Sequence, residues 1–126
     1  MRIRTRARDR GQAAIEYLGF LPILLIVGFA GLQLGIAAYA AQQAGTAARA
    51  AARAATTDEE DAPDYQAAAD AAVSGWINPA ATSQVSDEAV TVTVTVRIPQ
   101  VIPFWSFDPV VKTATMPRTP PAEDDE

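Results

Sequence analysis

The residues with the most distinctive chemistry lie close together near the start of the sequence. Glu16 stands at the edge of residues 17–41, a run without a charged side chain. An unpaired carboxylate at the membrane edge of an apolar helix costs free energy and normally marks a functional group. Gly11 lacks a Cβ atom, so a protease can approach the Gly11–Gln12 peptide bond closely. The alternative for Glu16 is a carboxylate at a helix start, where the helix dipole stabilises it.

Catalysis by this chain is not expected. The sequence contains no cysteine and no histidine, which removes thiolate nucleophiles, cysteine-type zinc sites and the commonest general base. The acidic residues 58–61 together with Asp64 could bind calcium, but they lack the glycine-centred spacing of such sites, so a solvated helix end is the better interpretation. We therefore predict no enzymatic activity, no cofactor, no metal ion and no small-molecule substrate.

Charge is divided unevenly along the chain. Residues 1–10 hold five arginines and one aspartate, a net charge of +4, whereas residues 42–126 hold five basic and thirteen acidic side chains, a net charge of −8. The basic end lies directly before the apolar run, so the positive-inside rule explains it better than nucleic-acid binding does. Residues 17–41 suffice for a bilayer core, which needs about 20 helical residues. We predict a single-pass protein of the inner (cytoplasmic) membrane, with a cytoplasmic N-terminus, an extracytoplasmic C-terminal part and no nucleic-acid partner.

One long helix is needed to position these residues. Alanine-rich sequence continues the apolar run without a break, so we expect a helix over residues 12–57, with the span inside it. Gln33 is the one strongly polar group in the span. Three glycines at helical spacing give the helix a small-residue face that permits close helix–helix approach. They are Gly28, Gly31 and Gly35, and the face is extended by Ala38, Ala41, Gly45 and Ala48.

Residues 58–117 are expected to form a small α+β part outside the membrane. A short second helix begins near Pro63 and runs to about Trp76 or Ile77. The aromatic residues Phe104, Trp105 and Phe107 follow in a proline-punctuated loop. We expect them to cover the small sheet; a contact patch for a partner or for the membrane face is the alternative.

The sheet is predicted from alternation. Residues 89–98 alternate valine or isoleucine with threonine or arginine, and a period of two with β-branched residues indicates a strand. Residues 110–116 indicate a second strand, and an antiparallel pair is the economical topology. The acidic, proline-rich residues 118–126 are expected to be disordered. The fold class is therefore α+β, with a two-stranded antiparallel sheet beside two helices.

The N-terminal stretch as a whole resembles a type IV pilin-like signal. An arginine-rich leader ends in Gly11, a glutamate stands at the fifth position after it, and a hydrophobic helix follows. The Glu16-Tyr17 pair is the form typical of the Flp, TadE and TadF proteins of the tight-adherence (Tad) pilus. The size of the chain, with a long helix before a small C-terminal part, looks most like a TadE-like protein.

The resemblance implies a processed subunit. A prepilin peptidase would cut between Gly11 and Gln12, remove the leader and expose a new α-amine. Glu16, with Tyr17 beside it, would pair with the α-amine of a neighbouring subunit and set the stagger between helices. The implied partners are the membrane, the prepilin peptidase, other pilin-like subunits and the Tad assembly platform. The implied function is that of a minor pilin or pseudopilin that helps to assemble or anchor a Tad-type pilus or a related secretion apparatus.

The second hypothesis is a secreted or membrane-anchored protein that leaves the cell by the general secretory route. Residues 38–40 resemble a small-x-small cleavage site, which places the cut after Ala40. The apolar run of a signal peptide usually has about 7–15 residues, and the run before this site is longer. Glu16 also lies at its start. The first residue of the mature protein separates the two routes: Gln12 indicates the pilin route, and Ala41 the secretory route.

Overall fold

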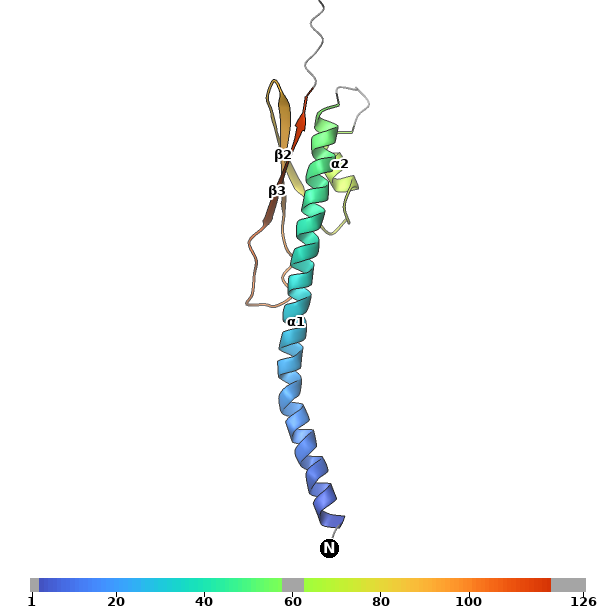
Figure 1. Cartoon of the computed structure of the whole chain (residues 1–126), viewed down its shortest axis with the longest axis vertical. Helices are drawn as coiled ribbons and strands as arrows, with labels where there is room; N and C mark the ends of the chain where they lie inside the picture. Colours follow the sequence, from blue (N-terminus) through green and yellow to red (C-terminus); the bar gives the residue numbers. More distant parts are fainter. Residues whose placement is uncertain (1–2, 58–62, 119–126) are drawn as a thin grey trace, which may run out of the picture.

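A long helix carries a small α+β unit on one end (Figure 1). The computed structural model describes residues 3–57 and 63–118, without the side chains of residues 3–9. The acidic residues 58–61 and most of the predicted disordered tail, residues 119–126, lie outside the described residues. The elements are α1 (Ile3–Ala55), α2 (Tyr65–Ala71), β1 (Ala80–Val85), β2 (Ala89–Val96) and β3 (Val110–Pro117).

Helix α1 is one uninterrupted element of 53 residues, about 80 Å long at about 1.5 Å per residue. It begins before the predicted start at residue 12, because the leader holds five arginines, and arginine is a good helix former. Pro22 lies within the helix without ending it. At the other end the hydroxyl groups of Thr56 and Thr57 donate to the carbonyl oxygen of Arg53 at 2.7 and 3.2 Å, which satisfies a terminal acceptor.

The sheet has three antiparallel strands in the order β1-β2-β3, so the prediction of a two-stranded sheet is wrong, while the α+β class is confirmed. Strand β2 is the central one, and its valines Val90, Val92, Val94 and Val96 are all fully buried. Strand β1 was missed because its sequence, AATSQV, has no apolar alternation. Its strand conformation comes from pairing with β2, from Ala80 opposite Thr95 to Val85 opposite Val90.

The second face of the sheet is lined with threonine. Thr91 lies opposite Thr115 and Thr93 opposite Thr113, and the hydroxyl oxygens of each pair are 3.0 and 3.4 Å apart. Because side chains alternate along a strand, this threonine face points away from the buried valines.

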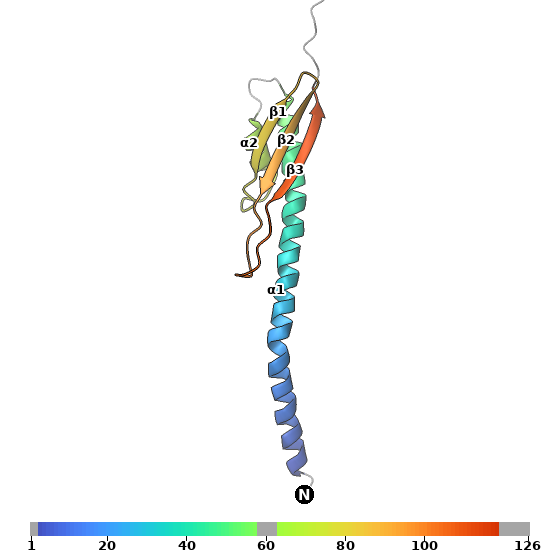
Figure 2. The same cartoon turned by 90° about the vertical axis from the view of Figure 1, so that its left-hand side faces the viewer.

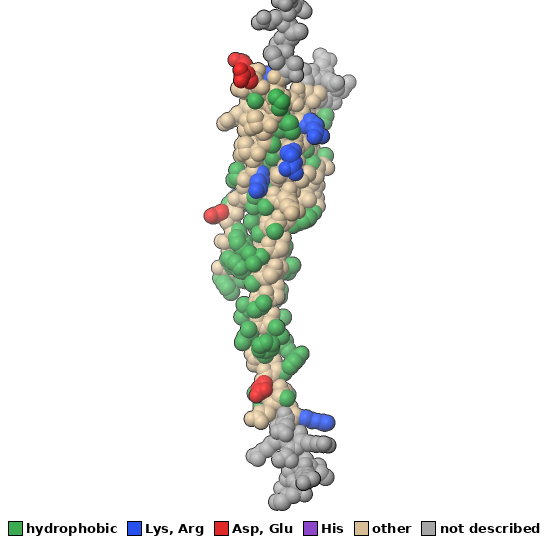
Figure 3. All heavy atoms as spheres, viewed as in Figure 1, with side chains coloured by type: hydrophobic (Ala, Val, Ile, Leu, Met, Phe, Trp, Pro, Cys, Tyr) green, Lys and Arg blue, Asp and Glu red, His purple; other side chains and the backbone are tan. Residues whose placement is uncertain are grey.

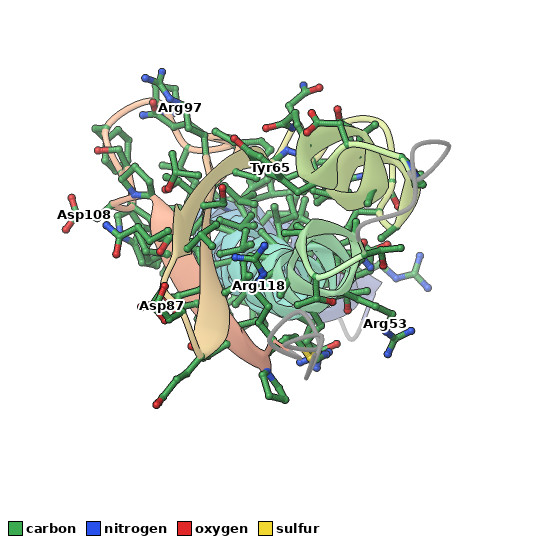
Figure 4. All side chains as sticks on the ribbon, turned by 90° about the horizontal axis from the view of Figure 1, so that it is seen from above. Arg53, Tyr65, Asp87, Arg97, Asp108 and Arg118 are labelled. Atoms are coloured by element: carbon green, nitrogen blue, oxygen red, sulfur yellow. The ribbon has the colours of Figure 1, made fainter. Side chains whose placement is uncertain are left out.

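The core lies between β2 and the C-terminal half of α1. Six alanines of α1 are buried there: Ala40, Ala44, Ala47, Ala48, Ala51 and Ala52. Their small side chains let the valine face of the sheet come close to the helix. Figure 2 shows the sheet and α2 beside the upper part of α1, and Figure 4, viewed along α1, shows the sheet and α2 on different sides of that helix. The expectation that Ala48 extends an open small-residue face is therefore wrong, because this alanine belongs to the core.

Helix α2 is shorter than the predicted helix, which reached Trp76 or Ile77. It ends at Ala71, and the following turns bury Ile77 in the core. The Gln66 side chain holds the next segment, because its Nε2 donates to Pro79 O at 2.8 Å and its Oε1 accepts from Ala81 N at 2.9 Å. These bonds fix the entry into β1.

Candidate functional site

The N-terminal half of α1 stands free of the folded part. Its apolar side chains are mostly exposed, among them Ile15, Leu18, Leu25 and Val27. Among the described residues, α1 is the one helix long and apolar enough to cross a membrane. Figure 3 shows this hydrophobic surface along the lower part of the molecule. The structure therefore presents a candidate membrane span that is not occupied in packing the protein's own core.

The predicted processing and pairing residues lie together at the start of this free helix. Gly11, Gln12, Glu16 and Tyr17 are all exposed on α1. A Cβ atom built on Gly11 would meet no other atom within 4 Å. Glu16 forms no ion pair with any residue whose side chain the structure describes. The carboxylate is thus available to a partner outside the chain.

The three glycines form an open strip on the helix. A Cβ atom at Gly28, Gly31 or Gly35 would have no neighbour within 4 Å. Gly31 and Gly35 are each two residues from the buried Gln33, which places them about 200° around the helix at about 100° per residue. The glycine strip therefore faces away from the side of α1 that carries the folded part.

Gln33 marks a contact that the sequence did not predict. The loop between β2 and β3, residues 97–109, runs back down along α1 (Figures 1 and 2). The fully buried Gln33 side chain donates from Nε2 to Pro99 O at 3.0 Å and accepts at Oε1 from Val101 N at 2.8 Å. Gln33 is the one strongly polar side chain in the apolar run, and this was the signal available in the sequence. The sequence did not identify its partner.

The aromatic cluster lies on this loop, beside α1. Phe104 is 92% exposed, so the expectation that it covers the sheet is wrong. The rings of Trp105 and Phe107 pack against each other with their centroids 5.2 Å apart. Between loop and helix lies an apolar cavity of about 320 Å³, lined by Ile26, Phe29, Ala30 and residues 101–105. Pro99 follows the end of β2, and the loop then descends to the level of the candidate span.

A polar hollow on the folded part contrasts with this apolar surface. It is lined by Arg49 of α1 and Lys112 of β3, together with Ala41, Gln42, Gly45 and Thr46. Figure 3 shows basic side chains on this end of the molecule. Across residues 3–57 and 63–118, the structure brings no three Asp, Glu, Cys or His side chains together as a metal site.

One of three comparisons with known proteins gave a match. A family model described as TadE-like protein matches residues 11–53, which confirms the resemblance over that segment. The match starts at Gly11 and ends in the part of α1 that packs against the sheet. Neither the curated proteins nor the solved structures gave a significant match.

Proposed function

We propose that this chain is a Tad pilus-associated membrane protein of the minor pilin or pseudopilin type. The match of residues 11–53 to the TadE-like family supports this proposal. It is processed by a prepilin peptidase and takes part in assembling or anchoring a Tad-type pilus or a related secretion apparatus. Its partners are the membrane, other pilin-like subunits and the assembly platform. Its role is structural and not enzymatic.

The observation that carries this proposal is the arrangement of α1. One end of the helix forms the core of the folded part, while the other end exposes apolar side chains and a glycine strip on the opposite side. A helix that projects this way can pack against similar helices without disturbing its own domain. Close approach of helices in a membrane relies on small residues of this kind.

Processing at Gly11 fits the exposure of this part of α1. Cleavage of the Gly11–Gln12 bond would leave an α-amine at Gln12, four residues from Glu16. An amine on one subunit and Glu16 on the next would then pair when the two helices are offset by about one turn, or about 5–6 Å. In the low dielectric of a helix bundle such a pair is stronger than in water.

The charge pattern supports an orientation. The +4 leader on the cytoplasmic side and the −8 remainder outside obey the positive-inside rule. Protease added to spheroplasts would then degrade the folded part and leave the free half of α1 protected. Full protection of residues 42–126 behind an intact membrane would contradict this orientation.

The alternative of cleavage after Ala40 fits the structure less well. Ala40 is fully buried in the core. The neighbouring Tyr39 ring stacks on Trp76 at 5.7 Å, and its hydroxyl oxygen lies 3.1 Å from Ser74 Oγ. A cut after Ala40 would remove these contacts from the folded part, together with the hydrogen bonds of Gln33 to Pro99 O and Val101 N. The pilin route keeps all of them.

Intact-mass measurement of the membrane-extracted protein tests the proposal. In cells that make a prepilin peptidase, we expect a product that begins at Gln12. Gly11→Leu should remain a precursor, whereas Gly19→Leu, a change at another glycine of α1 without a neighbour within 4 Å, should be cut normally. A wild-type product that retains residues 1–11 would contradict the processing, and one that begins at Ala41 would establish the secretory route.

A further inference from the structure

We propose that the β2–β3 loop, residues 97–109, dips its aromatic tip into the membrane interface on the side of the folded part and meets lipid there beside α1. This proposal rests on the membrane span proposed above. It adds a second contact with the bilayer, built from a loop whose Pro99 is 66 residues from Gln33 of the span in sequence. The occupant of the loop's exposed face is lipid.

The tip of the loop lies beside the candidate membrane span of α1. The apolar cavity places the tip of the loop, residues 101–105, beside Ile26, Phe29 and Ala30 of α1. A bilayer core takes about 20 helical residues. A span that starts at Tyr17 therefore ends near residue 36, and one that starts at Gln12 ends near residue 31. Under both limits the loop tip reaches at least the edge of the hydrocarbon.

The composition of the loop also favours contact with lipid. From Ile98 to Phe107 the sequence carries no charge, and the flanking charges are Arg97 and Asp108. Figure 4 shows Arg97 and Asp108 away from the α1 axis. The tip places Phe104 at 92% exposure beside Trp105. Tryptophan is concentrated where a protein meets the boundary between headgroups and acyl chains.

Several polar backbone groups of the loop have hydrogen-bond partners inside the protein. Irregular backbone that faces lipid is not tolerated in the hydrocarbon core, so a loop that touches the bilayer must stay near the interface or have its polar groups satisfied by protein. Gln33 pairs with Pro99 O and Val101 N. The Gln100 side chain donates to Ile102 O at 2.8 Å and to Pro103 O at 2.6 Å, and Trp105 N donates to Ile102 O at 3.1 Å.

The prolines of the loop work in the same direction. Pro99, Pro103 and Pro109 have no N–H group, so they remove three donors that lipid could not satisfy. A loop surrounded by water needs none of these provisions, since water satisfies its backbone. Their combination with an exposed aromatic tip favours lipid over an aqueous partner.

The two tryptophans of the chain provide a direct test. Trp105 lies in the loop, whereas Trp76 lies in the folded part and is 47% exposed. The full chain would be reconstituted in phosphatidylcholine vesicles, as Trp76→Phe to report on Trp105 and as Trp105→Phe to report on Trp76. Lipids brominated along the acyl chain quench a buried indole, and aqueous iodide quenches an exposed one.

We expect brominated lipid to quench Trp105 several-fold more than Trp76, and iodide to show the reverse order. Equal iodide quenching of both tryptophans would overturn the proposal. Lipid quenching of Trp105 that falls as protein density in the membrane rises would also overturn it, because a second copy of the chain would then cover the loop. Resistance to alkaline carbonate extraction reports separately on the α1 span. A carbonate-resistant protein with an iodide-accessible Trp105 would thus reject the loop insertion alone.

Cysteine labelling provides a second measurement that spares both tryptophans. The chain has no cysteine, so Phe104→Cys and Val85→Cys each introduce a single thiol. Both parent side chains are exposed, at 92% and 59%, which makes the pair a matched comparison. In vesicles, a water-soluble maleimide should label Val85→Cys several-fold faster than Phe104→Cys, and detergent should remove the difference. Equal rates in vesicles would contradict insertion of the loop.

Discussion

The side-chain amide of Gln33 donates to the carbonyl oxygen of Pro99 at 3.0 Å and joins residues 66 positions apart in the chain. Together with the bond from Val101 N, it holds a proline carbonyl and the N–H two residues later. Gln66 holds Pro79 and Ala81 in the same way. Two glutamines on two helices thus hold the segments that leave and enter the sheet, and both can be tested.

Gln33→Leu should destabilise the folded part and release the loop. The change keeps the bulk of the side chain but leaves Pro99 O and Val101 N without their partner. These two hydrogen bonds are part-buried, and a fully buried group left unsatisfied costs about 1–3 kcal/mol, so the midpoint of thermal unfolding in detergent should fall by a few degrees. Gln42→Leu is the control, because Gln42 is an exposed glutamine of the same helix. Equal unfolding midpoints for the two variants would show that the hydrogen bonds of Gln33 add no stability.

Gln66→Leu should loosen the start of β1. Hydrogen exchange of the Ala81 amide measures this directly, since that amide donates to Gln66 Oε1. Loss of about 1 kcal/mol of protection should speed its exchange about fivefold. Gln84→Leu, at an exposed position of β1, should leave the rate at Ala81 unchanged. An unchanged rate in Gln66→Leu would mean that pairing with β2 alone holds the strand.

Gly31→Leu should weaken association between chains while leaving each chain folded. No atom lies within 4 Å of a Cβ built at Gly31, so the monomer has room for the larger side chain. A neighbouring helix packed on the glycine strip would be pushed away, and we expect association about tenfold weaker or more. Energy transfer between labelled chains in vesicles measures it.

The control for this change is Gly19→Leu, also at an open glycine of α1. Gly19 lies twelve residues from Gly31, about a third of a turn around the helix surface at about 100° per residue. If both variants associate like the wild type, the glycine strip is not the interface between copies.

Glu16→Ala and Glu16→Gln should both be cut and inserted, yet fail in assembly. The peptide at Gly11 is unchanged, and removal of a charge favours insertion of α1. In a bundle the α-amine of Gln12 would be left without a partner, and co-purification with other pilin-like subunits should fall by about a hundredfold or more. Glu88→Gln, an exposed carboxylate outside the strands, is the control. Normal co-purification of both Glu16 variants would reduce this residue to a carboxylate at a helix start.

The sequence was sufficient to predict the elements that obey a strict period. The apolar run and the alanines after it predicted α1, and alternating valine and threonine predicted β2. Strand β1 has no such period and exists because β2 offers an unpaired edge. Helix α2 stops at Ala71, before its predicted end, because Ile77 is buried in the core by a turn. Tertiary packing therefore determines both the formation of β1 and the end of α2.

The course of the β2–β3 loop lay beyond reach of the sequence for a different reason. Its position depends on one amide, Gln33, that meets Pro99 and Val101 far along the chain. The sequence shows that Gln33 is polar and that Phe104, Trp105 and Phe107 are aromatic, but neither pattern contains a distance between them. The glycine strip was predicted from spacing alone, whereas its direction away from the folded part required the packing of the sheet.

The threonine pairs on the outer face of the sheet determine what an assembly would show to its surroundings. In any bundle built through the glycine strip, the folded parts would sit on the outside, with the threonine face turned away from α1. Thr91, Thr93, Thr113 and Thr115 would then coat that exterior with hydroxyl groups. Such a coat is wettable but carries no charge, so salt would have little effect on its contacts. A filament or base ring built in this way would meet other surfaces through neutral hydrogen bonding.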